Sequence, residues 1–301
     1  MKYIRFLEEL GQEDLPLAGG KGANLGELVA AGMKVPPGFV LTVEGYRRCV
    51  PPVSLPPEIS QDLTRLEEFS TELQKKILGI DLPEDLESEI IQAYRQMGSP
   101  PVAVRSSATA EDLPNASFAG QQETFLNVQE EKEILDSVKK CWASLWSARA
   151  IHYRGNQGFE DAEVALAVII QEMAPHEVSG IAFTVNPLTG NKNEMIINGA
   201  PGLGEAIVQG EVNPDQWVAR KPDGAVLRFT PAPRPSQMPT FSRRPQRTPR
   251  GYLTSQQIRE LASYCLRIEE HFGGVPQDIE WSYGEGEFFL LQSRPITTLE
   301  S

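Results

Sequence analysis

Cysteine, histidine and long apolar runs are all scarce in this chain of 301 residues. The three cysteines, Cys49, Cys141 and Cys265, are scattered and form no CxxC pair, so neither a disulfide framework nor a zinc site is expected. The longest aliphatic run, from Val164 to Ile170, is too short to span a bilayer. The N-terminus carries acidic residues where a signal peptide would be apolar. These absences predict a cytoplasmic protein with no membrane partner.

Basic residues are fewer than acidic ones: the chain has 28 Lys and Arg residues and 41 Asp and Glu residues, which gives a net charge of −13. A phosphate backbone needs a basic protein face, so this balance argues against nucleic acid as a partner. It does not exclude a nucleotide, which needs only a local cationic pocket. The 40% of hydrophobic and 23% of charged residues are ordinary for a soluble globular protein, and the length allows one large or two moderate domains.

The chain is organised around the stretch from Val102 to Val128, which reads as a short apolar strand, a loop and a second strand. The loop combines small residues, one proline and one glycine, which is turn chemistry. It carries a single cation, Arg105, among many hydroxyl and amide groups. A guanidinium fork with neutral donors around it suits a polyphosphate. The alternative is a solvated hairpin loop with an incidental arginine.

A second candidate anion site is the turn Gly19-Gly20-Lys21-Gly22, which precedes apolar residues at helical spacing. Free N–H groups and the helix dipole converge at a helix N-terminus and favour an anion there. The glycine spacing is not that of the Walker motif. The alternative is a surface lysine that happens to follow a glycine turn.

The third candidate is a β-hairpin between Asp278 and Pro295, turning at Gly284-Glu285-Gly286. Residues two apart in a strand share a face, so Asp278 lies beside Glu280, and Gln292 beside Arg294. If the hairpin brings these faces together, oxygen ligands suited to Mg²⁺ lie next to a guanidinium. A surface ion pair is the plainer alternative.

Outside the candidate sites, the sequence predicts one buried strand, several helices and one long connecting segment. A fully buried strand is expected over Val164–Met173, ending near Gln171. Two or three lid-like surface helices are expected over Glu58–Met97, and single long helices over Glu131–Arg154 and Thr254–Phe272. The segment Gly224–Ile258 has six arginines and no acid, and reads as an extended connection or a hairpin with a long tip. A docking surface for an acidic partner is the minority interpretation.

A resemblance to a known family is carried by three stretches: GGKGANLGELVAAGMKVPPGFVLT, VAVRSSATAEDLPNASFAGQQETFLNV and DIEWSYGEGEFFLLQSRPITTL. They closely resemble the ATP-binding domain of phosphoenolpyruvate synthase, pyruvate phosphate dikinase and rifampin phosphotransferase. The resemblance runs from about Leu17 to Leu299 and is weakest in Pro51–Met97 and Thr230–Arg250. It implies an α/β, ATP-grasp-like fold with ATP in the cleft between two subdomains, expected at residues 1–187 and 188–301.

The resemblance also implies a set of residues that contact ATP. By position in the matching motifs, these are Lys21, Arg105, Gly120, Thr124, Phe125, Gln171, Glu280, Gln292 and Arg294. Glu280 and Gln292 would hold Mg²⁺, while Lys21, Arg105 and Arg294 would be the catalytic cations that meet the phosphates.

In this family ATP is split to AMP, and its β-phosphoryl group passes to a histidine on a swivelling domain and then to a final small-molecule acceptor. None of His152, His176 and His271 lies in a threonine-rich loop like the one that carries the family's phosphohistidine. The expected function is therefore that of the ATP half of such a phosphotransferase. Two alternatives stay open: a free-standing ATP-grasp kinase or ligase that releases ADP, and a non-catalytic nucleotide-binding module.

Overall fold

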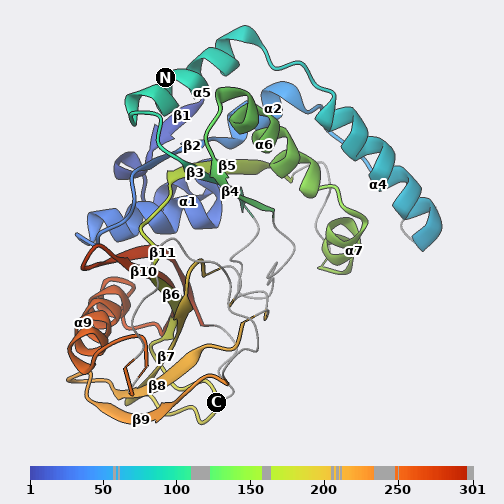
Figure 1. Ribbon diagram of the computed structural model, residues 1–301. Coiled ribbons are helices and arrows are strands. Elements are labelled where there is room, and N and C mark those ends of the chain that lie inside the picture. Colours follow the sequence, from blue (N-terminus) through green and yellow to red (C-terminus); the bar gives the residue numbers. More distant parts are fainter. Residues whose placement is uncertain are drawn as a thin grey trace. The chain divides into compact units, whose positions relative to one another are not determined.

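A computed structural model of the chain describes residues 1–56, 59, 62–109, 123–157, 164–204, 207, 210, 212–233, 248–249 and 251–296 (Figure 1). The chain divides into two compact units. Unit 1 comprises Met1–Glu27 and Pro37–Met173, and unit 2 comprises Leu28–Pro36 and Ala174–Ser301. Each unit has its own sheet and its own helices, so the expected mixed class of helices and sheets is confirmed.

Unit 1 is built on an antiparallel five-stranded sheet in the order β1-β2-β5-β3-β4. The strands are β1 (Ile4–Phe6), β2 (Gly38–Leu41), β3 (Val102–Ala108), β4 (Thr124–Val128) and β5 (Leu166–Glu172). The central strand, β5, is buried at every position except its last. This burial on both faces is what the continuous apolar run predicts.

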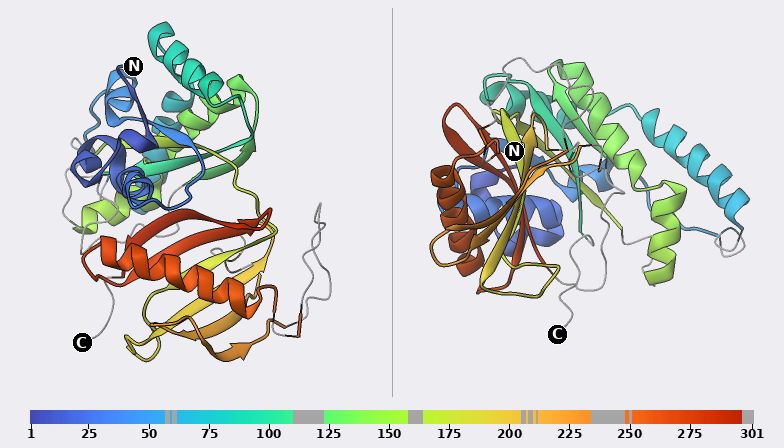
Figure 2. Two further views of the ribbon diagram at one scale, coloured as in Figure 1. Left: turned by 90° about the vertical axis from the view of Figure 1, so that its left-hand side faces the viewer. Right: turned by 60° about the horizontal axis from the view of Figure 1, so that its bottom comes forward.

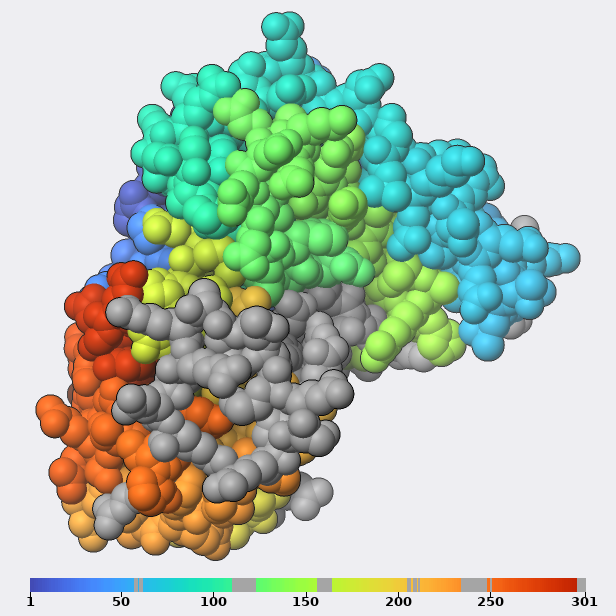
Figure 3. All heavy atoms as spheres, viewed as in Figure 1, coloured from blue at the N-terminus to red at the C-terminus, as the bar shows by residue number. Residues whose placement is uncertain are grey.

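The helices of unit 1 are α1 (Leu15–Ala30), α2 (Val43–Cys49), α4 (Leu63–Leu78), α5 (Glu84–Gln96), α6 (Glu131–Ser144) and α7 (Ala148–Gln157). The last residues of α1, from Leu28 on, belong to unit 2. Short 3-10 turns lie at Leu7–Glu9 and Gln12–Asp14. The expected separate helices of the 58–97 region are α4 and α5. Asp62 caps α4 by accepting from the backbone N–H groups of Thr64 and Arg65. α4 packs against α6 and α7 and forms an exposed ridge of this unit (Figure 3).

The single helix expected over Glu131–Arg154 is wrong, because the chain breaks between α6 and α7 at residues 145–147. Ser147 starts the new helix, and its Oγ accepts from the backbone N–H of Ala150 at 3.2 Å. Arg154 is fully buried, and its Nη1 donates to the Leu145 carbonyl at 2.6 Å. Its guanidinium also lies 5.1 Å from the centre of the Trp146 ring. The break thus leaves the Leu145 carbonyl available to accept a hydrogen bond from the buried guanidinium of Arg154.

Unit 2 is built on an antiparallel six-stranded sheet in the order β11-β10-β6-β7-β8-β9. The strands are β6 (Val178–Phe183), β7 (Glu194–Pro201), β8 (Asp215–Arg220), β9 (Val226–Thr230), β10 (Gln277–Gly284) and β11 (Glu287–Pro295). Helix α9 (Ser255–His271), which Thr254 caps, covers one face of this sheet (Figure 2). The ring of Tyr264 on α9 lies 6.4 Å from that of Phe288 on β11.

The unit boundary differs from the one expected at residue 187. Strand β6 pairs with β7 and β10, so it belongs to the second sheet and moves the boundary back to Met173. The segment Leu28–Pro36 also joins unit 2, where the Lys34 carbonyl accepts from the Leu290 N–H at 2.9 Å beside β11. These pairings are made between residues far apart in the chain, and local sequence patterns do not reveal them.

A buried carboxylate fixes the part of the basic, proline-rich segment that the structure describes. Asp215, at 0% exposure, accepts from the backbone N–H groups of Ala232 at 2.8 Å and of Tyr252 at 3.3 Å. Within the segment, Val226–Thr230 forms β9 and Thr248 pairs with Gly251, while 234–247 and 250 lie outside the described residues. One side chain therefore holds two chain positions that are 20 residues apart (252 − 232).

We expect Asp215→Ala to lower the free energy of unfolding by roughly 2–4 kcal/mol, because two backbone N–H groups lose a charge-assisted acceptor. Urea denaturation of the variant and wild type measures the loss. Asp136→Ala is the matched control, since Asp136 pairs with Lys139 along α6, and such surface pairs contribute little. Equal midpoints for both variants would contradict the role of Asp215.

Candidate functional site

In unit 1, α1 is tied to strand β3 around Lys21. The helix kinks at Gly19, whose φ is 70° and ψ 170°, so Lys21 lies in the first turn after the kink. Its Nζ donates to the Ser106 carbonyl at 3.3 Å. The Ser107 hydroxyl donates to the Ala18 carbonyl at 2.8 Å and accepts from the Gly22 N–H at 3.1 Å. The lysine is thereby held beside β3, which carries Arg105. The expectation that Arg105 lies in the loop is wrong, because β3 continues to Ala108 and Arg105 is paired with Thr124 and Ile169 within the sheet.

Arg105, Thr124 and Gln171 lie on the same face of the unit 1 sheet as α1. Arg105 is paired directly with Thr124 on β4 and with Ile169 on β5. Gln171 is two residues further along β5, opposite Ala103, so it is a diagonal neighbour of Arg105 on the same face. Ser107, which bonds to α1, shares that face. Together with Lys21 on α1, the structure therefore places four of the expected site residues on one side of this sheet.

Phe125 points the other way. It is paired with Val104, which faces opposite to Arg105, and its ring lies 5.4 Å from Nζ of Lys140 on α6. A contact of Phe125 with a ligand on the α1 side would have to use its main chain. Gly120, the other expected residue near it, lies outside the described residues.

In unit 2, the β10–β11 hairpin brings its polar side chains together as its sequence suggested. Asp278 is paired with Arg294, and Glu280 with Gln292. Nε of Arg294 donates to Oδ2 of Asp278 at 2.8 Å, and Nη2 lies 2.7 Å from the same oxygen in an ion pair. These four residues lie on the sheet face opposite to α9, because the alternate residues Trp281 and Phe288 pack toward that helix.

A β-bulge makes this arrangement possible. The register shifts between Glu280 and Trp281, so Trp281 faces Leu290 and Leu291 is the extra residue. In a regular ladder continued from Leu290, Gln292 would be paired with Ile279 and would lie on the α9 face, because a shift of one residue moves every side chain to the other face. The bulge therefore places Gln292 and Arg294 beside the two carboxylates.

One carboxylate oxygen of Asp278 is buried and makes no hydrogen bond within the described residues. The residue is only 8% exposed, and its Oδ1 has no hydrogen-bond partner among the residues that the structure describes. Burial raises the pKa of Asp278, Arg294 opposes that shift, and Glu280 adds to it. A buried oxygen without a partner is costly, so a bound cation would satisfy it.

The oxygen donors of Asp278, Glu280 and Gln292 fit Mg²⁺, which takes oxygen ligands and is commonly shared between one or two carboxylates and phosphate. No cluster of three or more His, Cys, Asp or Glu residues that could hold a metal occurs in the described part of the chain. The three oxygen donors on this face would leave positions around Mg²⁺ for phosphate oxygens.

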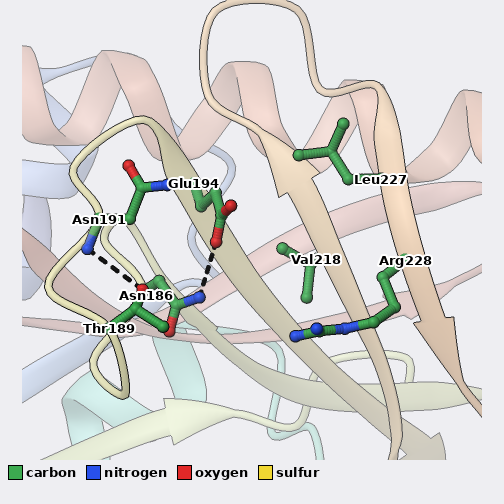
Figure 4. A pocket seen from close by; sticks show the side chains of 7 residues that line it. All are labelled: Asn186, Thr189, Asn191, Glu194, Val218, Leu227 and Arg228. Atoms are coloured by element: carbon green, nitrogen blue, oxygen red, sulfur yellow. Dashed lines mark hydrogen bonds between the residues drawn. The ribbon is translucent and has the colours of Figure 1, made fainter.

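Two surface hollows lie elsewhere. One, of about 500 Å³, is lined in unit 2 by residues of the β6–β7 loop and of β7, β8 and β9, where Asn186 donates to Glu194 at 2.7 Å (Figure 4). The other, of about 710 Å³, lies along α5 and includes Arg95 and Glu131. Neither is lined by a residue expected at the site.

Among the described residues, none of the helices combines the length and the apolar character that a membrane span requires.

Comparison with known proteins decides the family. The model of the pyruvate phosphate dikinase AMP/ATP-binding domain matches residues 15–301. The chain belongs to this family. The resemblance inferred from the motifs is thus confirmed.

Curated relatives cover nearly the whole chain. A probable phosphoenolpyruvate synthase of Methanothermobacter thermautotrophicus is 43% identical over 99% of this chain and 46% of its own length. The phosphoenolpyruvate synthase of Pyrococcus furiosus is 39% identical over 99% and 44%, and the rifampicin phosphotransferase of Streptomyces sviceus is 38% identical over 99% and 36%. The chain thus spans less than half the length of these relatives.

Among solved structures, D-alanine–D-alanine ligase from Helicobacter pylori aligns over 93% of this chain and 51% of its own, with 12% identity and a TM-score of 0.36. This likeness is too weak to add to the assignment.

We expect Gly19→Ala to lower the free energy of unfolding by roughly 2–4 kcal/mol, through backbone strain and a steric clash. A Cβ at Gly19 would come within 2.3 Å of the Ser107 carbonyl oxygen. Gly98→Ala is the matched control, because Gly98 has a φ of +85° but a Cβ there would meet no described atom within 4 Å; it should cost about 1–2 kcal/mol. Equal losses in urea denaturation would show that the α1–β3 contact is not tight.

Proposed function

We propose that the chain binds Mg-ATP and acts as the ATP half of a phosphotransferase that passes the β-phosphoryl group to a histidine on a separate swivelling domain. The observation that carries this proposal is the β10–β11 hairpin, where a guanidinium, two carboxylates and an amide share one face. Membership of the AMP/ATP-binding family supports it, as do the names of the relatives, phosphoenolpyruvate synthase and rifampicin phosphotransferase.

The residues of unit 1 would bind the phosphates through charge and neutral donors. Lys21 and Arg105 supply the cations, and Arg105 offers a planar fork that matches phosphate oxygens. Thr124 and Gln171 add neutral hydrogen-bonding groups on the same face of the sheet. Phosphoryl transfer depends mainly on positioning and charge neutralisation, and these residues provide both.

The residues of unit 2 would hold the metal. Glu280 and Gln292 supply oxygen ligands, and Asp278 can add its Oδ1. Bound Mg²⁺ would neutralise charge on the transferring phosphoryl group. Arg294 is already oriented by Asp278, and part of its side chain, at 42% exposure, remains accessible to a phosphate.

The phosphoryl acceptor would come from another domain. Among the histidines, His152 is on α7, His271 ends α9, and His176 has its Nδ1 2.8 Å from the Ala174 carbonyl. None lies on the sheet faces that carry the expected site residues. A swivelling domain with an acceptor histidine and a final small-molecule acceptor therefore complete the proposed reaction.

The direct experiment is product analysis with ATP labelled in its β-phosphoryl group. We expect the chain alone to turn over Mg-ATP slowly, because transfer needs an aligned acceptor. Adding the histidine-bearing domain of a relative should start AMP formation and label its histidine. Rapid ADP release by the chain alone, with a phosphorylated small molecule, would establish the direct kinase or ligase instead.

We expect Arg105→Ala to weaken Mg-ATP binding about tenfold or more, since a charge-assisted hydrogen bond contributes roughly 1.5–3 kcal/mol. Arg105→Lys should restore affinity only in part, because the planar fork is lost. Arg95→Ala is the control, since Arg95 pairs with Glu131 at the surface of α5 and α6. An unchanged calorimetric titration of Arg105→Ala would remove Arg105 from the site.

We expect Glu280→Gln and Gln292→Ala to raise the Mg²⁺ concentration needed for half-maximal turnover, because each removes or weakens an oxygen ligand. Binding of ATP without metal should change less. Glu285→Gln, in the exposed turn of the same hairpin, is the control. If all three variants share the Mg²⁺ dependence of wild type, the hairpin is a structural ion pair.

A further inference from the structure

The polar face of the unit 2 sheet continues beyond the hairpin. The cross-strand register joins five residues in one row: Gln292 on β11, Glu280 on β10, Ile181 on β6, Asn198 on β7 and Gln216 on β8. Each is directly paired with the next, so all five side chains project from the same face. The row therefore leads from the proposed metal ligands to a pair of neutral amides.

Asn198 and Gln216 form a hydrogen-bonded pair. Nε2 of Gln216 donates to Oδ1 of Asn198 at 3.2 Å, and both residues are half-buried. This bond uses the Asn198 carbonyl and one N–H of Gln216. The Asn198 amide nitrogen still has donors to offer, and the Gln216 carbonyl oxygen can still accept. The pair thus presents a donor and an acceptor side by side.

An apolar strip separates this amide pair from the carboxylates. Ile181 stands between Glu280 and Asn198 in the row, and Phe183 lies beside it on the same face, opposite Asp278. Both side chains are only half-buried. Adjacent strands are about 4.8 Å apart, so Glu280 and Asn198 lie roughly 10 Å apart along the row.

The order of these surfaces matches a nucleotide. Its phosphates need cations and metal ligands, its base is a flat and largely apolar ring, and its base edge and sugar hydroxyls are uncharged hydrogen-bonding groups. Neutral amides discriminate such groups well, because a partner lacking the matching donor or acceptor leaves a polar atom unsatisfied. Amide side chains also match the donor and acceptor pattern of the adenine edge.

We propose that Asn198 and Gln216 bind the nucleoside of the nucleotide whose phosphates are held at Glu280 and Gln292. The contact uses either the base edge or the ribose hydroxyls, which share the same uncharged hydrogen-bonding chemistry. The inference rests on the proposed function and deepens it, because it names residues that recognise the non-phosphate part of the ligand.

The test compares ligands with and without a nucleoside. Wild type, Asn198→Leu and Gln216→Met are titrated by calorimetry with Mg-ATP, Mg-GTP, Mg-2′-deoxyATP and Mg-tripolyphosphate. The substitutions keep side-chain size and remove hydrogen bonding. Asn193→Leu, at an exposed position of the β6–β7 loop, is the matched control. Retained tripolyphosphate binding shows that a variant is folded.

We expect each row variant to bind Mg-ATP about three- to tenfold more weakly, the effect of losing one neutral hydrogen bond or more. Its affinity for Mg-tripolyphosphate should stay within about twofold of wild type, since the nucleoside contact alone is lost. Loss of ATP-over-GTP preference assigns the contact to the base, and loss of ATP-over-deoxyATP preference assigns it to the ribose.

Two results would overturn the inference while leaving the proposed function intact: unchanged Mg-ATP affinity in both variants, or equal losses for Mg-ATP and Mg-tripolyphosphate. A wild-type chain that binds neither ligand would overturn the proposed function as well.

Discussion

One extra residue in strand β11 decides which side chains of unit 2 can meet a ligand. The bulge at Leu291 keeps Leu290 opposite Trp281 in the core and turns Gln292 and Arg294 to the face that carries Asp278 and Glu280. Because strand residues alternate between faces, no smaller change could separate a packed core from a polar face within one hairpin. The pairing of Arg294 with Asp278 and that of Gln292 with Glu280 both depend on this register.

In unit 1, Gly19 and Ser107 decide how closely α1 approaches the sheet face that carries Arg105. Ser107 is 0% exposed and bonds to α1 on both sides of the kink at Gly19. No side chain fits at Gly19, so the helix can approach β3 closely enough for Lys21 to reach the Ser106 carbonyl. Lys21 and Ser106, which are 85 positions apart in sequence, thus come together next to Arg105 on β3. Each unit therefore builds its polar face on a rigid sheet, which suits the positioning demanded by phosphoryl transfer.

The sequence predicts what local periodicity and turn chemistry govern. Strands β4 and β5, the β10–β11 hairpin and helix α9 follow from apolar runs, alternation, a glycine turn and helical spacing, whereas β3 extends four residues into the segment expected to be a loop. It does not predict features that depend on partners distant in the chain. The bulge at Leu291, the break before α7 that buried Arg154 uses, and the outward turn of Phe125 toward Lys140 are set by tertiary contacts. The site motifs were recognisable because they are long, whereas Asn198 and Gln216 carry no local signal and became visible only through the register.

The proposed function requires that each unit contributes its own surface to Mg-ATP binding. Hydrogen–deuterium exchange of the chain, with and without Mg-ATP, tests it peptide by peptide, since bound ligand lowers local opening. We expect slower exchange both in the α1 and β3 peptides around Lys21 and Arg105 and in the β10–β11 peptides from Asp278 to Arg294. The α4 peptides, far along the chain from every proposed contact, should be unaffected. Protection confined to one unit, or absent from both, would contradict it.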